Sequence, residues 1–202
     1  TATVAAGTAA SLKAALTDVT ATDALKLKVT GTATAADLIS LIGKTTVDVD
    51  ASKVTAITGK AADVKTVVES ADISTATNVA VTITDSLTDV SDLNDIADKS
   101  GKITAKLEAN MATLATLDTA ATDAITIKVT DNAAKAAELK ALDGKTSVVV
   151  NASAVTTINV GTGESVADLA TVLAAKTIAK AANVAVTIDD AISAIQANTI
   201  AK

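Results

Sequence analysis

Hydrophobic and polar residues alternate along seven short stretches of the chain. Strict alternation is typical of a β-strand with one buried face. The stretches are residues 25–30, 46–51, 79–84, 102–108, 125–130, 147–152 and 184–189, and most follow one another after about 22 residues. In the first stretch we expect Leu25, Leu27 and Val29 to face a core, which leaves Lys26 and Lys28 to solvent.

Between these stretches the apolar positions take the period of an α-helix. In "TAADLISLIG" the residues Ala35, Leu38, Ile39 and Ile42 recur at i, i+3, i+4 and i+7, the pattern of an amphipathic helix. The same period predicts short helices within residues 60–70, 88–99, 132–144, 164–176 and 190–198. Glycines at positions 43, 101 and 144 fall where a helix gives way to a strand, as helix-ending glycines do.

The chain also repeats itself half way along. The string "ATDALKLKVT" (21–30) returns as "ATDAITIKVT" (121–130), and "TTVDVDASKVTAI" (45–57) returns as "TSVVVNASAVTTI" (146–158). A third string, "NVAVTITDS" (78–86), returns as "NVAVTIDDA" (183–191). Because the order of the strings is kept, they indicate a superrepeat of about 100 residues.

A strand and a short helix every 22 residues or so favour parallel strands joined by right-handed crossovers. We therefore predict an α/β fold, a right-handed β/α solenoid with a parallel sheet on one side and short helices on the other. We expect one continuous solenoid over residues 1–202, with superrepeats at roughly 21–120 and 121–202. Residues 1–20 would complete a preceding repeat. The terminal stretches are no more polar than the middle, so we expect either a longer chain or end-to-end stacking of copies.

Composition narrows the possible functions. Hydrophobic residues make up 49% of the chain, yet Phe, Trp, Tyr, Cys, Pro, His and Arg are all absent. A core filled only with small, similar side chains is what a repeat protein needs. The net charge of −6, without Arg or aromatic stacking platforms, argues against nucleic-acid binding. No run of about 18 apolar residues occurs, so we predict no membrane insertion.

The predicted outward faces carry mixed polar residues. Lys28 is expected beside Asp50 of the next strand, in a solvated ion pair worth about 0–1 kcal/mol. Two alternatives treat the sheet face as a ligand surface, for glycans or for ice. Outward T-x-T arrays can bind ice, but here the predicted columns mix Lys, Asp, Ala and Thr.

An acidic run, "DSLTDVSDLNDIAD", has helical spacing. Its carboxylates are Asp85, Asp89, Asp92, Asp95 and Asp98, with Asp189 and Asp190 at the equivalent later helix start. We interpret the run as a solvated helix face with Asp85 near the helix N-terminus. A surface calcium site is the alternative, although the turning glycine of a calcium loop is missing.

Candidates for catalysis are scarce. There is no His or Cys, and no Ser has a base beside it in sequence. The string "NVGTGES" (159–165) resembles part of a phosphate loop but lacks the closing G-K-[ST], so we interpret it as a loop between two coils. We predict no catalytic, cofactor-binding or metal residues, and no enzyme.

The strings "TTVDVDASKVTAITGKAADVKTV", "NVAVTITDS" and "AIQANTIAK" resemble the Thr/Ala-rich repeats of giant bacterial surface and secreted proteins, of the kind found in cyanobacteria. The resemblance covers most of the chain and carries over no ligand or catalytic residue. It implies an extracellular or cell-surface role as part of a filament, surface layer or adhesin stalk. The alternative is an extracellular binding module that uses the sheet face.

Overall fold

The structure is a computed structural model that describes residues 1–201. The chain is α/β, as predicted: short helices follow strands, and the described strand pairs are parallel. It divides into two compact units, one of Thr1–Ser86 with Ser91–Ala105 and one of Leu87–Val90 with Lys106–Lys202. The final lysine of the "AIQANTIAK" string, Lys202, lies outside the described residues.

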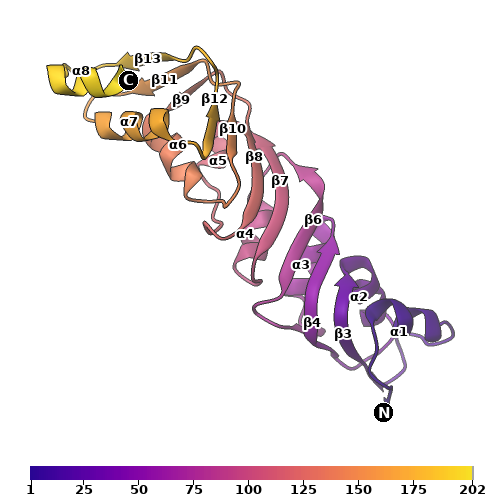
Figure 1. Cartoon of the computed structure of the whole chain (residues 1–202). Helices are drawn as coiled ribbons and strands as arrows, with labels where there is room; N and C mark the ends of the chain where they lie inside the picture. Colours follow the sequence, from indigo (N-terminus) through magenta and orange to yellow (C-terminus); the bar gives the residue numbers. More distant parts are fainter. Residues whose placement is uncertain (202) are drawn as a thin grey trace. The chain divides into compact units, whose positions relative to one another are not determined.

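The first unit stacks strands beside helices. Its strands are β1 (Ala2–Thr3), β2 (Leu25–Lys26), β3 (Lys28–Thr34), β4 (Val49–Gly59), β5 (Ile73–Thr75) and β6 (Ala80–Leu87, which ends just past the unit). Its helices are α1 (Ala9–Ala15), α2 (Ala35–Ile42), α3 (Ala61–Glu69) and α4 (Ser91–Ala97). Strand β4 pairs with β3 on one side and with β5 and β6 on the other, and α2 packs between α1 and α3 (Figure 1).

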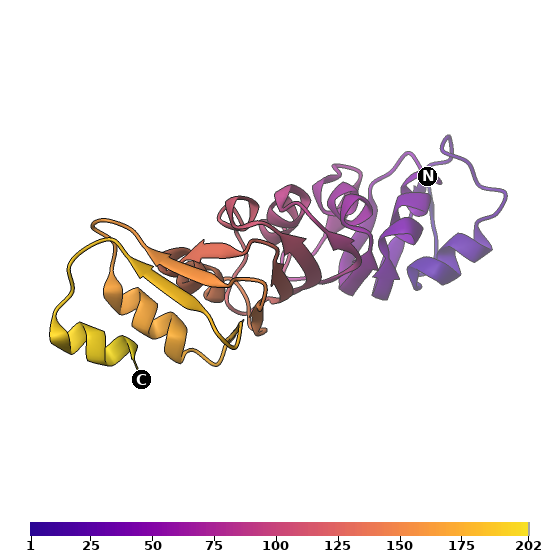
Figure 2. The same ribbon diagram turned by 90° about the horizontal axis from the view of Figure 1, so that it is seen from above.

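The second unit repeats this plan. Its strands are β8 (Ala124–Val129), β9 (Ala133–Lys135), β10 (Val150–Ala152), β11 (Thr157–Val160), β12 (Ile178–Lys180) and β13 (Ala185–Ile188). Its helices are α5 (Met111–Leu114), α6 (Ala136–Asp143), α7 (Val166–Ala174) and α8 (Ala194–Ile200). One set of neighbours is β8, β10 and β12, and the other is β9, β11 and β13. Helices α6 and α7 pack beside the second set, and α8 packs against α7 (Figure 2). Strand β7 (Ile103–Ala109) crosses the boundary between the units.

The alternating stretches are strands, as predicted, with their apolar residues inward. Leu27 and Val29 are buried in the first unit, and Ile127 and Val129 occupy the same places in the second. Leu25 is only half-buried. The stretches 46–51 and 147–152 become strands only at Val49 and Val150. Before these strands, the Thr45 hydroxyl oxygen accepts from the Val47 N–H at 3.0 Å, and that of Thr146 accepts from the Val148 N–H at 3.1 Å.

The predicted face of helix α2 was partly wrong. Ala35, Leu38 and Leu41 are completely buried, whereas Ile39 and Ile42 are half-buried. This helix has neighbours on both flanks, so its flanking residues are partly covered and only a narrow stripe faces the strands. The alternation and helix patterns also missed α1 and α5, because α1 has only one large apolar residue, Leu12, and α5 has only four residues. Each nonetheless has an N-cap side chain, from Thr8 and Asn110 respectively.

Two buried threonines fix the starts of equivalent strands. The Thr146 hydroxyl donates to the Ile125 carbonyl at 2.7 Å, and its oxygen accepts from the Ile125 N–H at 3.0 Å. Thr45 makes the same two bonds to Leu25, at 2.8 and 2.9 Å. In each case one side chain of the later segment holds both backbone groups of one residue in the segment before it. The duplicated sequence therefore builds duplicated hydrogen bonds.

Replacement of this buried hydroxyl is expected to be costly. Thr146→Val keeps the side-chain shape but leaves the Ile125 backbone groups without this partner, so we expect a loss of about 1–3 kcal/mol of unfolding free energy. Thr126→Val, at an exposed position on β8, should change it by less than about 0.5 kcal/mol. Urea unfolding followed by circular dichroism measures both. Equal effects of the two substitutions would contradict the role of the buried threonine.

The three predicted helix-ending glycines play two different roles. Gly43 and Gly144 are the C-cap residues of α2 and α6, as expected. Gly101 instead lies where two backbones approach closely, because a Cβ built there would be 2.6 Å from the Asn78 carbonyl oxygen. At Gly43 the nearest atom to such a Cβ, the Ser40 carbonyl oxygen, is 3.6 Å away.

These distances predict opposite tolerance to alanine. Gly101→Ala should destabilise the first unit by about 1–3 kcal/mol, since one of two backbones must move. Gly43→Ala has room for its methyl group and a helical φ of −70°, and should be nearly neutral. Thermal unfolding of the two variants provides the comparison, and a Gly101→Ala variant as stable as Gly43→Ala would show that no close approach exists.

Candidate functional site

The outward face of the first unit carries the predicted cross-strand pair. Lys28 and Asp50 are opposite one another in the β3–β4 register, with Nζ and Oδ2 3.9 Å apart and both side chains about half exposed. Ser52 donates its hydroxyl to Asp50 Oδ1 at 2.6 Å, and this hydrogen bond is the main reason that the pKa of Asp50 is lowered. In the second unit the repeated Lys128 turns to Glu108 instead, at 2.6 Å. The pairs are solvated, so they contribute little stability.

A second outward face differs from the sequence-based expectation. Thr34, Thr58 and Thr82 stand in register on β3, β4 and β6, and all three are exposed. The residues two positions earlier are Thr32, Ala56 and Ala80, so this face of the first unit is small and uncharged. We refer to these six residues as the threonine face. The predicted mixing of Lys, Asp, Ala and Thr therefore holds where Lys28 faces Asp50, and is wrong for the column of Thr34, Thr58 and Thr82.

The corresponding face of the second unit is charged and amide-bearing. The aligned residues on β9, β11 and β13 are Lys135, Asn159 and Thr187. Lys135 forms a 2.8 Å ion pair with Glu164, which raises the pKa of Lys135 and lowers that of Glu164. The uniform threonine column thus belongs to the first unit, although both units share the same strand arrangement.

Carboxylates of the acidic run lie on two different elements, strand β6 and helix α4. Asp85 lies in strand β6 and not at a helix start, because the strand alternation continues to Leu87. Its Oδ1 accepts from the N–H of Ala61 at 3.0 Å, so it caps α3 of the preceding segment. Asp92 and Asp95 both bind Lys65, at 3.1 and 2.6 Å, and these bonds, with Asp95 the larger cause, raise the pKa of Lys65.

These carboxylates are not arranged for calcium. Within residues 1–201 no group of three acidic side chains converges on a point that could hold a metal ion. Their oxygens instead accept from a lysine and from a helix N-terminus of the neighbouring segment.

Helix-to-helix ion pairs recur at one position in both units. The fifth residue of a helix is a lysine, and it binds an acidic residue in the first turn of the next helix along the stack. The pairs are Lys13–Asp37 at 2.7 Å and Lys140–Asp168 at 2.6 Å, besides the Lys65 cluster. An acidic side chain in the first turn of a helix also interacts favourably with the positive end of the helix dipole. Sequence reasoning missed this ladder because its partners lie about one segment apart, although each lysine and acid was visible.

The loop that resembles a phosphate loop is occupied by its own carboxylates. Glu164 accepts from the Gly161 N–H at 2.8 Å, and Asp190 accepts from the Gly163 N–H at 2.6 Å. Gly163 adopts a φ of 77°, which favours glycine. Because two acidic side chains take the amide donors that a phosphate would need, the loop is unsuited to an anion. The prediction of a loop is confirmed for residues 161–165, whereas Asn159 and Val160 belong to β11. The loop joins β11 to α7 within one strand–helix segment and does not connect two segments.

The ion-pair ladder predicts a pH dependence of stability. The Lys13 ammonium, and to a lesser degree the Thr34 side chain, hold the pKa of Asp37 below its usual value of 3.8. A lowered folded-state pKa contributes stability above about pH 4, and this contribution is lost as pH falls through the folded pKa. Asp37→Asn and Lys13→Gln should therefore both flatten the fall in unfolding free energy between about pH 5 and about pH 2. Lys26→Gln, which removes an exposed charge elsewhere, is the control for net charge, and an equally flat profile for it would contradict the prediction.

No helix of the described chain is long and apolar enough to cross a membrane. The chain matches no known family model, no curated protein and no solved structure.

Proposed function

We propose that this chain is a structural repeat segment of an extracellular bacterial surface protein, such as a filament, a surface layer or an adhesin stalk. In this proposal the strand–helix segments form a right-handed β/α solenoid, and the chain is not an enzyme. The observation that carries the proposal is that three pairs of successive helices, α1–α2, α3–α4 and α6–α7, are linked by the same kind of lysine–acid contact. The ion pairs join residues between 20 positions apart, for Lys128 and Glu108, and 30 positions apart, for Lys65 and Asp95.

Such a plan can be lengthened without new chemistry. Each segment buries its apolar residues and satisfies its backbone against the segments on either side, which is the property of repeat architectures. Several lysines and acids, among them Lys13 with Asp37 and Lys140 with Asp168, hold neighbouring helices together. A role in extending a rigid element accounts for both features.

The last strand–helix segment supports assembly with further segments. Helix α8 has no buried residue, and Ile195 on it is 79% exposed. On β13, Val186 and Ile188 are half-buried, whereas their partners Ile158 and Val160 on β11 are fully buried. We infer that another segment covers this apolar face, supplied either by a longer chain or by a second copy stacked end to end.

A second candidate function is an extracellular binding module. The threonine face of the first unit favours it, because a flat array of short hydroxyl and methyl groups suits an ordered surface such as ice or a glycan crystal. Strand spacing would place the column hydroxyls about 4.8 Å apart and residues two positions apart along a strand about 6.7 Å apart. The lack of aromatic residues for stacking on sugar rings weighs against individual glycans.

Microscopy over a concentration series tests the first proposal. We expect the purified chain to form end-to-end assemblies whose length grows with concentration, as seen by negative-stain electron microscopy and sedimentation velocity. Ile195→Lys should shorten or abolish them, because a charge at the exposed apolar position disfavours burial. Asn198→Lys, on the same helix, adds the same charge without removing an apolar group and should have a smaller effect.

Other outcomes would point elsewhere. A strictly monomeric protein that binds a soluble ligand tightly would contradict the structural role. Growth inhibition of ice crystals that is lost in Thr58→Lys, and kept in the charged second-unit variant Asn159→Lys, would favour the binding module. Antibodies to the chain should label intact cells of the source organism, and labelling only after lysis would contradict the extracellular location.

A further inference from the structure

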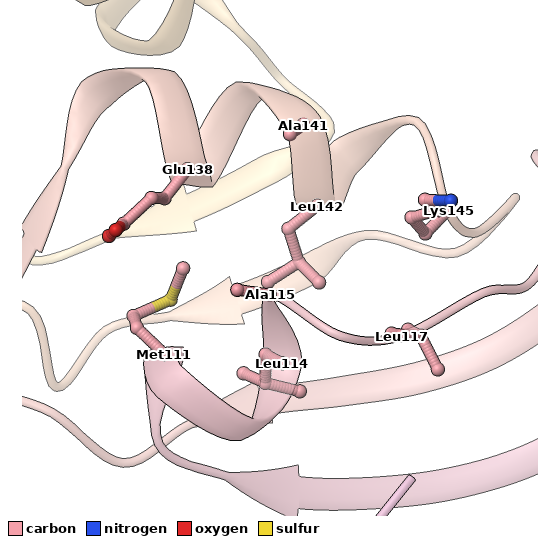
Figure 3. A pocket seen from close by; sticks show the side chains of 8 residues that line it. All are labelled: Met111, Leu114, Ala115, Leu117, Glu138, Ala141, Leu142 and Lys145. Atoms are coloured by element: carbon pink, nitrogen blue, oxygen red, sulfur yellow. The ribbon is translucent and has the colours of Figure 1, made fainter. Parts of the chain in front are cut away.

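Helix α5 leaves a gap in the helix layer of the second unit. It has four residues, whereas the next helix, α6, has eight. A cavity of about 110 Å³ lies between the two helices and the loop that follows α5 (Figure 3). It is a consequence of helix length, since one turn cannot cover the same area as two.

The wall of this cavity is apolar. Met111, Leu114 and Leu117 form one side, and Leu142 of α6 points toward them from the other (Figure 3). All four side chains are at most 7% exposed, whereas Ala115 and Ala141 are exposed, so the cavity has a buried apolar floor and opens to solvent at its rim. Ala115 and Ala141 contribute only methyl groups.

Its two charged neighbours are engaged elsewhere. The Glu138 carboxylate accepts from the N–H of Lys135 at 3.3 Å, at the start of α6. The Lys145 ammonium donates to Asp118 at 3.1 Å. Across the described residues, no buried side-chain nitrogen or oxygen lacks a hydrogen-bond partner. A water molecule at the buried floor would therefore find few polar groups to bind and is displaced by an apolar ligand at little cost.

We propose that this cavity is a binding site for a small apolar molecule or group of about the size of a benzene ring. Enclosed apolar cavities of roughly 150 Å³ bind benzene and xenon because the ligand restores the dispersion contacts that an empty wall lacks. The cavity here is open on one side, and its buried floor of Met111, Leu114, Leu117 and Leu142 offers the same kind of contact. The volume here is of the same order, and the opening beside Ala115 and Ala141 gives access. The ligand carries no charge, since burying one without a partner is strongly unfavourable.

The composition of the chain allows one methyl signal to report on the cavity without overlap from other residues. Met111 is the only methionine, so protein labelled with ¹³C at the methionine methyl group gives a single signal, and it comes from the cavity wall. The chain has no aromatic residue, so a ring-current shift of that signal can come only from an added aromatic ligand. Titration with benzene should shift the Met111 methyl signal in a saturable way and raise the melting temperature.

Matched variants assign the shift to the cavity. Ala115→Leu fills the space and should reduce the benzene-induced shift at least tenfold, whereas Ala62→Leu, an exposed alanine on α3, should leave it unchanged. Leu142→Ala enlarges the cavity and should tighten benzene binding severalfold. Circular dichroism establishes that each variant is folded, and Ala141→Leu replaces Ala115→Leu if that variant is not. A shift that stays linear up to the solubility of benzene, or one that survives in the filled variant, would overturn the proposal.

Discussion

Pairing between successive segments is the interaction on which the rest of this structure depends. A single strand–helix segment exposes one edge of unpaired backbone groups and an apolar face that it cannot bury alone. Parallel neighbours satisfy both at once, as β4 does for β3 and β6 and as β11 does for β9 and β13. The lysine–acid pairs and the two buried threonines add side-chain links across the same junctions. No described residue contributes aromatic bulk, so stability comes from repetition of small contacts.

Pairing between successive segments explains why simple sequence patterns predicted the strands and their equivalent positions. Alternation predicted the strands and their inward residues, because each strand lies between a core and solvent. It also predicted the opposition of Lys28 and Asp50, which requires only that neighbouring strands be parallel and in register. The repeated strings located equivalent places, and Thr45 and Thr146 show that the equivalence extends to individual hydrogen bonds.

The predictions that were wrong, and the features that were missed, have physical causes. Helix α2 buries Leu41 in place of Ile39, since its flanks are shared with two neighbouring helices and a helical period alone cannot show that. The role of Asp85 was misassigned because its partner, Ala61, lies in another segment. The threonine face depends on the β-bulge-containing register of β3 and β4, which sequence spacing does not fix. The cavity results from a helix one turn shorter than its neighbour, and neither α5 nor its shortness was predicted.

The ladder of contacts between adjacent segments also bears on how the chain acquires its fold. Among residues 1–201 every ion pair described above joins positions no more than 30 apart, so the loops that must close during folding are short and of similar length. Proteins dominated by such contacts fold faster than those that must join distant parts of the chain. A segment leaving the ribosome would need only the one synthesised just before it as a template. Folding could then keep pace with synthesis at any chain length, so that no long, aggregation-prone stretch accumulates.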